Sequence, residues 1–484
     1  MDKIFKLKEH HTDVKTEILA GLTTFMTMAY VLAVQPGAIV GAEATITDCN
    51  GDVISKSAIL VMCALVSGLI TILMAFYANM PFALSTGMGT NFLLGAMIQG
   101  GTMSFGSAMV ITLISGVIFV ALTVLGLRDI IVRMIPKNIK TAISASIGFF
   151  IAYLGFSNTG IGSFNGGIGM GDFTQPSVLL AVLGLAIIGV LTAYNVKGAI
   201  LIGIAVITVL GIPFGITVLP AHPFAIPDFS DLSTVCFNFD FSGLFTSSAA
   251  IWIFIAFFGD FFSTLGTVLG VAGKAKMLDK DGNLPGIQKP FLVDAIGTCV
   301  GACTGNTTIT TFVESTSGVE AGGRTGLTAL TTGIMFLLTI FAAPLFVVIP
   351  YAATGPALIF VGFLMIGGLT EIDFSDFTEA FGPFMMIVFG AFTANIAASI
   401  GAGIIAHIVI KVFTGKAKEI HPGLYILCIP MVLYFIYNQG PSFMSKESPS
   451  RHRTLDDLPG ALYFFPLTAA VKEFSPYVCV HALC

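Results

Sequence analysis

The chain contains a series of apolar runs that are each long enough to cross a lipid bilayer as a helix. A spanning helix needs about 20 predominantly apolar residues. Only 10% of the 484 residues are charged, whereas soluble domains contain about 25%. Because backbone groups cannot bond to water inside lipid, these runs must form helices. The runs lie near residues 16–41, 57–78, 104–127, 139–157, 177–195, 198–215, 249–273, 288–304, 325–348, 354–370, 377–393 and 395–414.

Two further segments are too rich in Gly, Ser and Thr to be ordinary spans. They lie at 81–100 and 305–320, and each follows the second span of its half. The β-branched run Thr307, Thr308, Thr310 and Thr311 disfavours a helix, so we expect an extended piece that leads into a half-helix. With these two segments, the chain reads as seven elements, a loop and seven elements.

The two halves also share short sequence matches in the same order. Ile135-Pro136 and Gly148-Phe149 recur as Ile349-Pro350 and Gly362-Phe363 at a constant offset. Because seven is an odd number, the second half must be inverted relative to the first. Inverted repeats with interrupted helices in equivalent places are typical of secondary transporters. The sequence therefore predicts an all-α membrane protein of 14 transmembrane segments, arranged as a 7+7 inverted repeat.

Positive charges lie on one side of this predicted topology, which makes that side cytoplasmic. The N-terminus contains Lys3, Lys6, Lys8 and Lys15. Further positive residues come after the fourth element (Arg128, Arg133, Lys137 and Lys140), after the eighth (Lys274, Lys276, Lys280 and Lys289) and after the fourteenth (Lys416 and Lys418). The loop on the opposite side has Asp228, Asp231 and Asp240 but no Lys or Arg. The predicted parts are a cytoplasmic N-terminus at 1–15, a first repeat at 16–215, an extracellular loop at 216–248, a second repeat at 249–414 and a C-terminal segment and tail at 415–484.

Two acids stand inside the apolar sequence of the second half. Asp260 lies in IWIFIAFFGDFFSTLGTVLG, where a helix places it on one face with Thr264 and Thr267. An ionisable side chain at membrane depth costs several kcal/mol, about 3 on permissive scales. The polar face could serve only helix–helix hydrogen bonds, an explanation that suits Thr267 better than Asp260. We therefore expect Asp260 to face an internal polar site.

Glu314 lies close to the expected break at 305–320, and Asn91 occupies the matching segment PFALSTGMGTNFLLG. Exposed N–H groups at a break can bind a polar ligand. A carboxylate accepts two hydrogen bonds in one plane, which suits a flat heterocycle with adjacent N–H groups. Removal from water also favours the protonated form of a carboxyl group. One acid could therefore bind the cargo while the other binds a proton, and the sequence leaves open which does which. For 81–100, a short re-entrant loop with a structural Asn is the alternative.

Other chemistries find little support in the sequence. Cys299 and Cys303 lie one helical turn apart without clustered partners, so a metal site is not expected. Gly169-Met170-Gly171-Asp172 matches the motif of intramembrane aspartyl proteases, but it falls in a predicted external loop. No nucleophile–base pair stands out. We therefore expect no enzyme activity, no cofactor and no nucleic-acid partner.

Four segments together resemble the purine permeases of the nucleobase–cation symporter-2 family, in the azaguanine/hypoxanthine/guanine/adenine branch. They are TEILAGLTTFMTMAYVLAVQP, GMGTNFLLG, GDFFSTLGTVLG and GNTTITTFVESTSGVEAGGRTGLTA, and the resemblance runs from about residue 14 to 437. Two positions depart from the branch's pattern. Gln35 stands where Asn is usual, and Ser263 stands where a second Asp often follows Asp260.

The resemblance implies a core domain and a gate domain, with short strands in the third and tenth segments framing the substrate site. The core would comprise about 16–127 and 249–348, and the gate about 128–215 and 349–414. By motif, Asp260 and Glu314 would be the principal substrate or coupling residues and Asn91 would support them. Phe25 and Thr310 are weaker candidates for substrate binding.

The family further implies import of purine bases (hypoxanthine, guanine or adenine) across the cell membrane by proton symport. The expected coupling ion is H+, the partners are the purine and the lipid bilayer, and a homodimer is left open. The alternative is an anion transporter or channel on the same architecture. That alternative predicts basic or backbone-only sites at the half-helices, and Glu314 argues against it.

Overall fold

The computed structural model describes residues 2–126, 136–164, 168–220, 222–226, 229–245, 247–279, 284–393 and 396–437. All of them belong to one compact unit, which ends at Asn438. The predicted tail beyond this unit lies outside the described residues, as do Arg128, Arg133, Ile135, Asp228 and Lys280.

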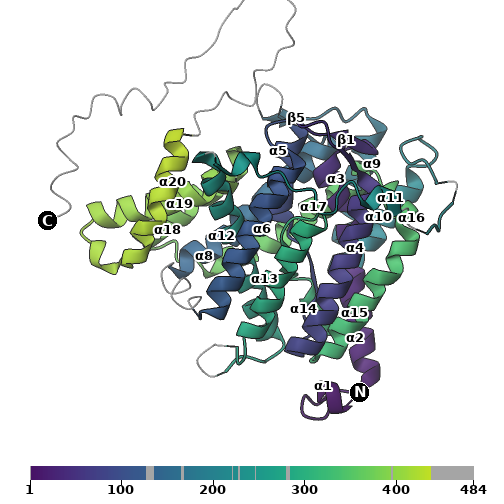
Figure 1. The fold of residues 1–484 in the computed structure, drawn as a ribbon, viewed down its shortest axis with the longest axis horizontal. Helices are drawn as coiled ribbons and strands as arrows, with labels where there is room; N and C mark the ends of the chain where they lie inside the picture. Colours follow the sequence, from purple (N-terminus) through teal and green to yellow (C-terminus); the bar gives the residue numbers. More distant parts are fainter. Residues whose placement is uncertain are drawn as a thin grey trace, which may run out of the picture. The chain divides into compact units, whose positions relative to one another are not determined.

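The described segments of the first repeat run from α2 to α10 (Figure 1). A short helix α1 (Asp2–Phe5) precedes them, and the first segment is divided at Ala29–Tyr30 into two helices. The elements are α2 (Val14–Met28) with α3 (Val31–Val40), the hairpin β1 (Thr45–Thr47) and β2 (Val53–Ser55), α4 (Lys56–Leu73) with the π-helical turn η1 (Met74–Ala78), β3 (Leu84–Thr86) with α5 (Met88–Gln99), α6 (Phe105–Val124), α8 (Lys137–Thr159), the hairpin β4 (Gly162–Ser163) and β5 (Gly169–Met170), α9 (Pro176–Ala193) and α10 (Ala199–Leu210).

The second half repeats this order after a loop that holds α11 (Phe229–Leu232) and η2 (Ser242–Phe245). A final helix follows the fourteenth segment, at the apolar stretch 422–437. The elements are α12 (Ser247–Lys274), α13 (Gln288–Cys303), β6 (Ile309–Thr311) with α14 (Ser315–Glu320), α15 (Gly326–Thr339) with η3 (Ile340–Ala342) and α16 (Ala343–Val347), α17 (Tyr351–Ile366) with η4 (Gly367–Glu371), α18 (Phe377–Thr393), α19 (Ile396–Phe413), η5 (Ala417–Glu419) and α20 (Pro422–Tyr437).

Both segments that were expected to break are a short strand followed by a short helix, as predicted. The strands β3 and β6 pair antiparallel, with Ser85 opposite Thr310 at the centre of the register. The backbone N–H of Gly87 continues the pairing by donating to the carbonyl oxygen of Thr308 at 2.7 Å. A Cβ at Gly87 would lie 2.6 Å from the Thr308 hydroxyl, so glycine permits this close approach.

Seven of the helical stretches in the described residues are long and apolar enough to cross a membrane by themselves. Four shorter apolar helices, at 199–210, 351–366, 377–393 and 398–413, accompany them. The remaining segments are α13, which carries a buried acid, and the two strand–helix segments. The prediction of a polytopic all-α membrane protein is confirmed.

Helix packing follows the inverted repeat. By their order in the two halves, α2 is equivalent to α12, α4 to α13 and α6 to α15. The contact of α6 with α13 is therefore repeated by that of α15 with α4, and the contact of α2 with α15 by that of α12 with α6. Likewise α9 with α17 becomes α18 with α8. Two contacts map onto themselves, α8 with α17 and β3 with β6. The predicted 7+7 inverted repeat is therefore confirmed, and these two contacts lie on its pseudo-twofold axis.

Six helices pack mainly on one another: α8, α9, α10, α17, α18 and α19. The other long helices pack mainly among themselves and around the two strands. Contacts between the two groups are fewer, and they include α8 with α12 and α10 with α2.

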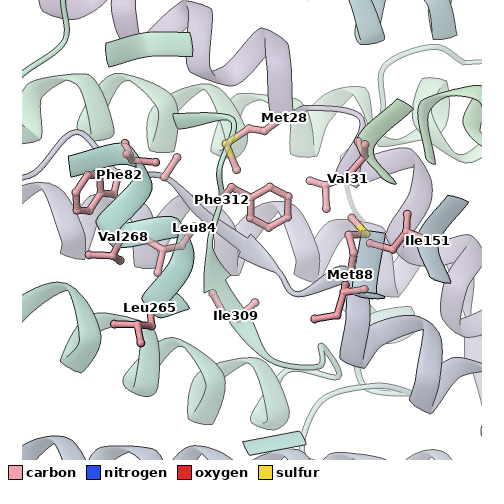
Figure 2. Close-up of a cluster of buried hydrophobic side chains, with 14 of the residues drawn as sticks. Met28, Val31, Phe82, Leu84, Met88, Ile151, Leu265, Val268, Ile309 and Phe312 are labelled. Carbon is pink, nitrogen blue, oxygen red and sulfur yellow. The ribbon is translucent and has the colours of Figure 1, made fainter. Parts of the chain in front are cut away.

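The two strands are embedded in apolar side chains. Figure 2 shows Leu84 and Ile309 among Met28, Leu265 and Phe312. All five are buried, which removes the paired strands from lipid and from water. Hydrogen bonds in such a setting must be satisfied within the protein, because an unsatisfied buried polar group is costly.

Candidate functional site

The site is built on the paired strands, which equivalent threonines of the two repeats hold in place. Thr71 of α4 accepts from the N–H of Leu84 at 3.0 Å and donates to its carbonyl oxygen at 3.1 Å. Thr298 of α13 makes the same two bonds to Ile309, both at 3.2 Å. The strands are thus fixed by side chains rather than by a larger sheet.

The second repeat adds carboxyl groups to this scaffold. Asp260 of α12 accepts from the Thr298 hydroxyl at 2.8 Å, and Asp294 of α13 accepts from the Thr264 hydroxyl at 2.7 Å. Both helices therefore carry an Asp four residues before a Thr, and each Asp bonds to the other helix's Thr. Asp260 is 2% exposed and Asp294 is fully buried. This reciprocal pair joins α12 to α13 inside the protein.

Both helices then reach strand β6. The Thr264 and Thr310 hydroxyls lie 2.8 Å apart. Asp294 accepts from the backbone N–H of Thr311 at 2.7 Å and from its hydroxyl at 3.1 Å. The predicted residue Thr310 therefore belongs to a hydrogen-bonded network that also contains Asp294.

One oxygen of Asp260 stands apart from this network. Its Oδ1 atom is buried and makes no hydrogen bond within the described part of the chain. Buried carboxyl oxygens normally have a partner, because leaving one without is costly. The atom therefore keeps an unused capacity to accept a hydrogen bond within the described residues.

Glu314 lies between strand β6 and helix α14, where the sequence predicted a break. It is 8% exposed, and its Oε1 atom accepts from the Tyr30 hydroxyl at 2.8 Å. Tyr30 lies at the division between α2 and α3. Tyr30, at the interruption of the first span, thus holds Glu314 of the tenth segment in place.

Asn91 lies in the first turn of α5, the helix that follows strand β3. Its Nδ2 atom donates to Gln35, and its Oδ1 atom accepts from the Thr307 hydroxyl at 3.3 Å. The Nε2 atom of Gln35 is buried and has no hydrogen-bond partner among the residues described. The first repeat thus contains a second buried polar atom without a partner in the described residues.

Phe25 is placed differently from the polar candidates. Its ring packs edge-on against Phe336 of α15, with centroids 5.3 Å apart. This contact belongs to the packing of α2 on α15. At Ser263, where the purine-permease branch often has an acid, the side chain is half-buried.

The sequence analysis did not assign Asp294, Thr298, Tyr30 or Gln35 to this network, although it noted Gln35 as a departure from the branch's pattern. Asp294 carried a usable signal, because it is an acid in the apolar run 288–304 with Thr298 one turn later. The spacing of Asp294 and Thr298 is the same as that of Asp260 and Thr264. Tyr30 and Gln35 carried no comparable signal, since their partners come from distant segments.

Comparison with known proteins identifies the family. A family model described as "Permease family" (Xan_ur_permease) matches residues 15–402. The chain belongs to this permease family. It is 35% identical over 435 residues to adenine permease AdeQ of Escherichia coli, covering 89% of this chain and 94% of the relative. It is 35% identical over 446 residues to guanine/hypoxanthine permease PbuG of Bacillus subtilis, covering 90% and 100%.

Solved structures show the same fold. The transmembrane domain of the cyanobacterial bicarbonate transporter BicA aligns with a TM-score of 0.58 at 16% identity, covering 80% of this chain and 97% of that one. SLC26A9 aligns with a TM-score of 0.56 at 11% identity, covering 83% and 66%. The predicted resemblance to purine permeases and the inverted-repeat architecture are both confirmed. The protein is a multi-pass membrane protein of the nucleobase permease family.

Proposed function

We propose that this protein imports purine bases such as hypoxanthine, guanine or adenine by proton symport. The observation that carries the proposal is the buried Oδ1 atom of Asp260, which has no protein partner in the described residues. Relatives that align with about nine-tenths of the chain are named adenine permease and guanine/hypoxanthine permease, and these names favour a purine as the cargo.

A purine suits the donors and acceptors of the site. Its ring N–H groups can donate to Asp260 and Glu314, while Asn91 and Gln35 can bond to its acceptor atoms. The Thr310 hydroxyl bonds to Thr264, and Phe25 packs on Phe336 of α15; we assign both a weaker part in substrate binding. Because an apolar interior stabilises an unpaired carboxylate poorly, a proton that arrives with the cargo lowers the energy of the loaded state.

The third acid extends this scheme. Asp294 accepts three hydrogen bonds, from Thr264 and Thr311. At the equivalent place in the first repeat, one turn before Thr71, stands Ser67, which bonds to Ser85 at 2.7 Å. The buried acids of the site thus come from the second repeat, and we assign proton binding to the group formed by Asp260, Asp294 and Glu314.

Transport would occur by movement of a core domain, which carries both strand–helix segments, against a gate domain. The separate packing of α8, α9, α10, α17, α18 and α19 supports this division, with the core at about 16–127 and 249–348 and the gate at about 128–215 and 349–414. We place the protein in the cell membrane with the N-terminus in the cytoplasm, because the lysines of the N-terminus and of alternate loops share one side.

Uptake by purified protein in liposomes tests the proposal. Labelled hypoxanthine, guanine or adenine should accumulate faster when the outside is more acidic, and a proton ionophore should abolish the acceleration. Asp260→Asn and Glu314→Gln should each reduce uptake at least about tenfold, the factor that corresponds to 1.4 kcal/mol. Asp172→Asn, at an exposed acid that bonds Thr174 before α9, is the matched control and should transport like wild type.

Absence of purine uptake and of purine binding by folded protein would refute the function. Wild-type kinetics in both acid variants would refute the residue roles. The anion alternative is not favoured, because a carboxyl group stands directly before α14 and because likeness to the bicarbonate transporter shows the fold alone. Electrogenic anion current without purine uptake would support that alternative.

A further inference from the structure

Another fully buried acid lies outside the site described above. Glu17, in the first turn of α2, is fully buried. Its carboxylate accepts from the backbone N–H groups of Arg324 at 2.8 Å and of Thr325 and Thr328 at 3.2 Å. The Thr328 hydroxyl donates to it at 2.6 Å. Both oxygens of Glu17 therefore bind the link that joins half-helix α14 to helix α15.

An acid suits this position because α15 begins there. The first N–H groups of a helix have no partner within it, and they carry the positive end of its dipole. Glu17 accepts from the N–H groups of Thr325 and Thr328, the second of which also donates to the carbonyl oxygen of Thr325 at 3.2 Å. Thr325 caps α15 by accepting from the N–H of Leu327 at 3.3 Å. Arg324 completes the link by donating to the carbonyl oxygens of Val319 and Gly323, each at 2.6 Å.

The same helix, α2, also holds α14 along its length. The Thr27 hydroxyl lies 2.7 Å from that of Ser317. A Cβ at Gly318 would lie 2.0 Å from the Thr24 hydroxyl, so α14 packs directly on α2. At the near end, Tyr30 bonds to Glu314. The first span therefore anchors the tenth segment in the middle and at both ends.

We propose that Glu17 is a positioning residue for Glu314: it fixes the far end of α14, and thereby the place of the Glu314 carboxylate against Tyr30. Helix α14 has six residues and is about 9 Å long, so a shift at its far end reaches Glu314 over fewer than two helical turns. A displaced link would therefore shift the Glu314 carboxylate away from Tyr30, even though neither Glu314 nor Tyr30 is substituted. The role of Glu314 in transport rests on the proposed function; the anchoring of α14 by Glu17 does not.

Hydrogen–deuterium exchange on the purified full-length protein tests the anchoring independently of transport. In Glu17→Gln, one carboxylate oxygen becomes an amide nitrogen that faces N–H donors. The amides of 313–328 should then exchange at least about threefold faster, while those of 84–99 keep their rate. The matched control is Asp13→Asn, whose carboxylate caps α2 at Lys15 and Thr16 and touches neither α14 nor α15. Unchanged exchange at 313–328 would overturn the inference.

A second variant keeps the test decisive if Glu17→Gln does not fold. Thr328→Val removes one donor to Glu17 and leaves the carboxylate in place. It should speed exchange at the same amides by a smaller factor, and wild-type exchange there would count against the anchoring.

A double-mutant cycle on purine uptake then tests the route to Glu314. Glu17→Gln and Tyr30→Phe should each raise KM by about three- to tenfold, and the double variant should raise it no more than the larger single change. A purely structural Glu17 would instead give multiplying effects on KM, which would overturn the inference. If wild type takes up no purine, the proposed function fails while the exchange result still decides the anchoring.

Discussion

At the scale of single residues, the site depends on how each buried carboxyl group is paired. Asp260 has one bonded and one unbonded oxygen, whereas both oxygens of Asp294 accept hydrogen bonds. The two acids therefore differ in their availability to a ligand. We expect Asp260 to contact the cargo, and Asp294, besides its share in the proposed proton binding, to hold strand β6 in place beside it.

Substitution of Asp294 tests this difference. Asp294→Asn should reduce uptake at least about tenfold, because its amide nitrogen cannot accept from Thr264 or Thr311. Initial rates across purine concentrations in proteoliposomes provide the measurement, with Asp172→Asn as the control. Uptake equal to wild type would show that β6 does not need this acid.

Outside the membrane, Asp376 gives a pH-dependent contribution to stability. The hydroxyl and the N–H of Thr378 each donate to its Oδ1 atom at 2.8 Å, and Lys416 lies 3.0 Å from Oδ2. The Thr378 hydroxyl, with Lys416 and the Thr378 N–H, lowers the pKa of Asp376 to about 2. A lowered pKa in the folded state adds stability above the unfolded pKa of about 3.9, and this is lost as pH falls towards 2.

Asp376→Asn should therefore lower the Tm of the detergent-solubilised protein at pH 7. The difference from wild type should shrink as the pH falls from 4 to 2, because the wild-type carboxylate then becomes protonated and resembles the amide. Thermal unfolding measured at each pH tests this expectation. A Tm difference that stays constant over that range would contradict it.

At the scale of elements, the tenth segment shows how a half-helix is held. Its six helical residues are too few to be stable alone, since isolated helices shorter than about 12 residues are marginal. Contacts with α2 stabilise it, and Gly318 permits them. The β-branched threonines before it form strand β6 only because β3 supplies the pairing partner.

Gly318→Ala should disrupt this packing. The added Cβ would lie 2.0 Å from the Thr24 hydroxyl and 2.8 Å from the carbonyl oxygen of Ala20. Such overpacking costs about 1–3 kcal/mol, so both Tm and uptake should fall. Gly266→Ala in α12 is the matched control, because nothing lies within 4 Å of its Cβ position. A Tm for Gly318→Ala equal to that of Gly266→Ala would contradict the packing.

At the scale of the whole molecule, the pseudo-twofold axis explains a sequence match. Gly148 and Gly362 were recognised as equivalent residues of the two repeats, and they meet in the contact of α8 with α17. A Cβ at Gly148 would lie 2.7 Å from the carbonyl oxygen of Gly362, and a Cβ at Gly362 would lie 2.4 Å from that of Gly148. Equivalent residues next to a twofold axis face each other, so both Gly148 and Gly362 must be small for the two helices to approach this closely.

Gly148→Ala and Gly362→Ala should therefore have similar effects. Each forces α8 away from α17 inside the proposed gate, so Tm and the maximal uptake rate should fall while KM, set by the proposed core, changes less. Uptake and thermal unfolding measure both quantities, and Gly189→Ala, with nothing within 4 Å of its Cβ position, is the control. An effect confined to one of the two glycines would argue against their shared place on the axis.

Sequence alone determined the membrane class, the number of segments, the inverted repeat and the two interrupted segments. Apolar length, charge placement and β-branching report on local energetics, so they can be read along the chain. Asp260, Glu314 and Asn91 stood out for the same reason, because a polar group in an apolar run is costly wherever it packs.

Tertiary structure alone decided which groups meet. Tyr30 reaches Glu314 across 284 positions of sequence, and Glu17 reaches Thr328 across 311. The reciprocal bonds of Asp260 and Asp294 depend on how α12 packs against α13. Hydrogen bonds between distant segments depend on packing in three dimensions, and no local pattern encodes them. The chain therefore shows where the costly polar groups lie, whereas the fold determines which of them find hydrogen-bond partners within the protein.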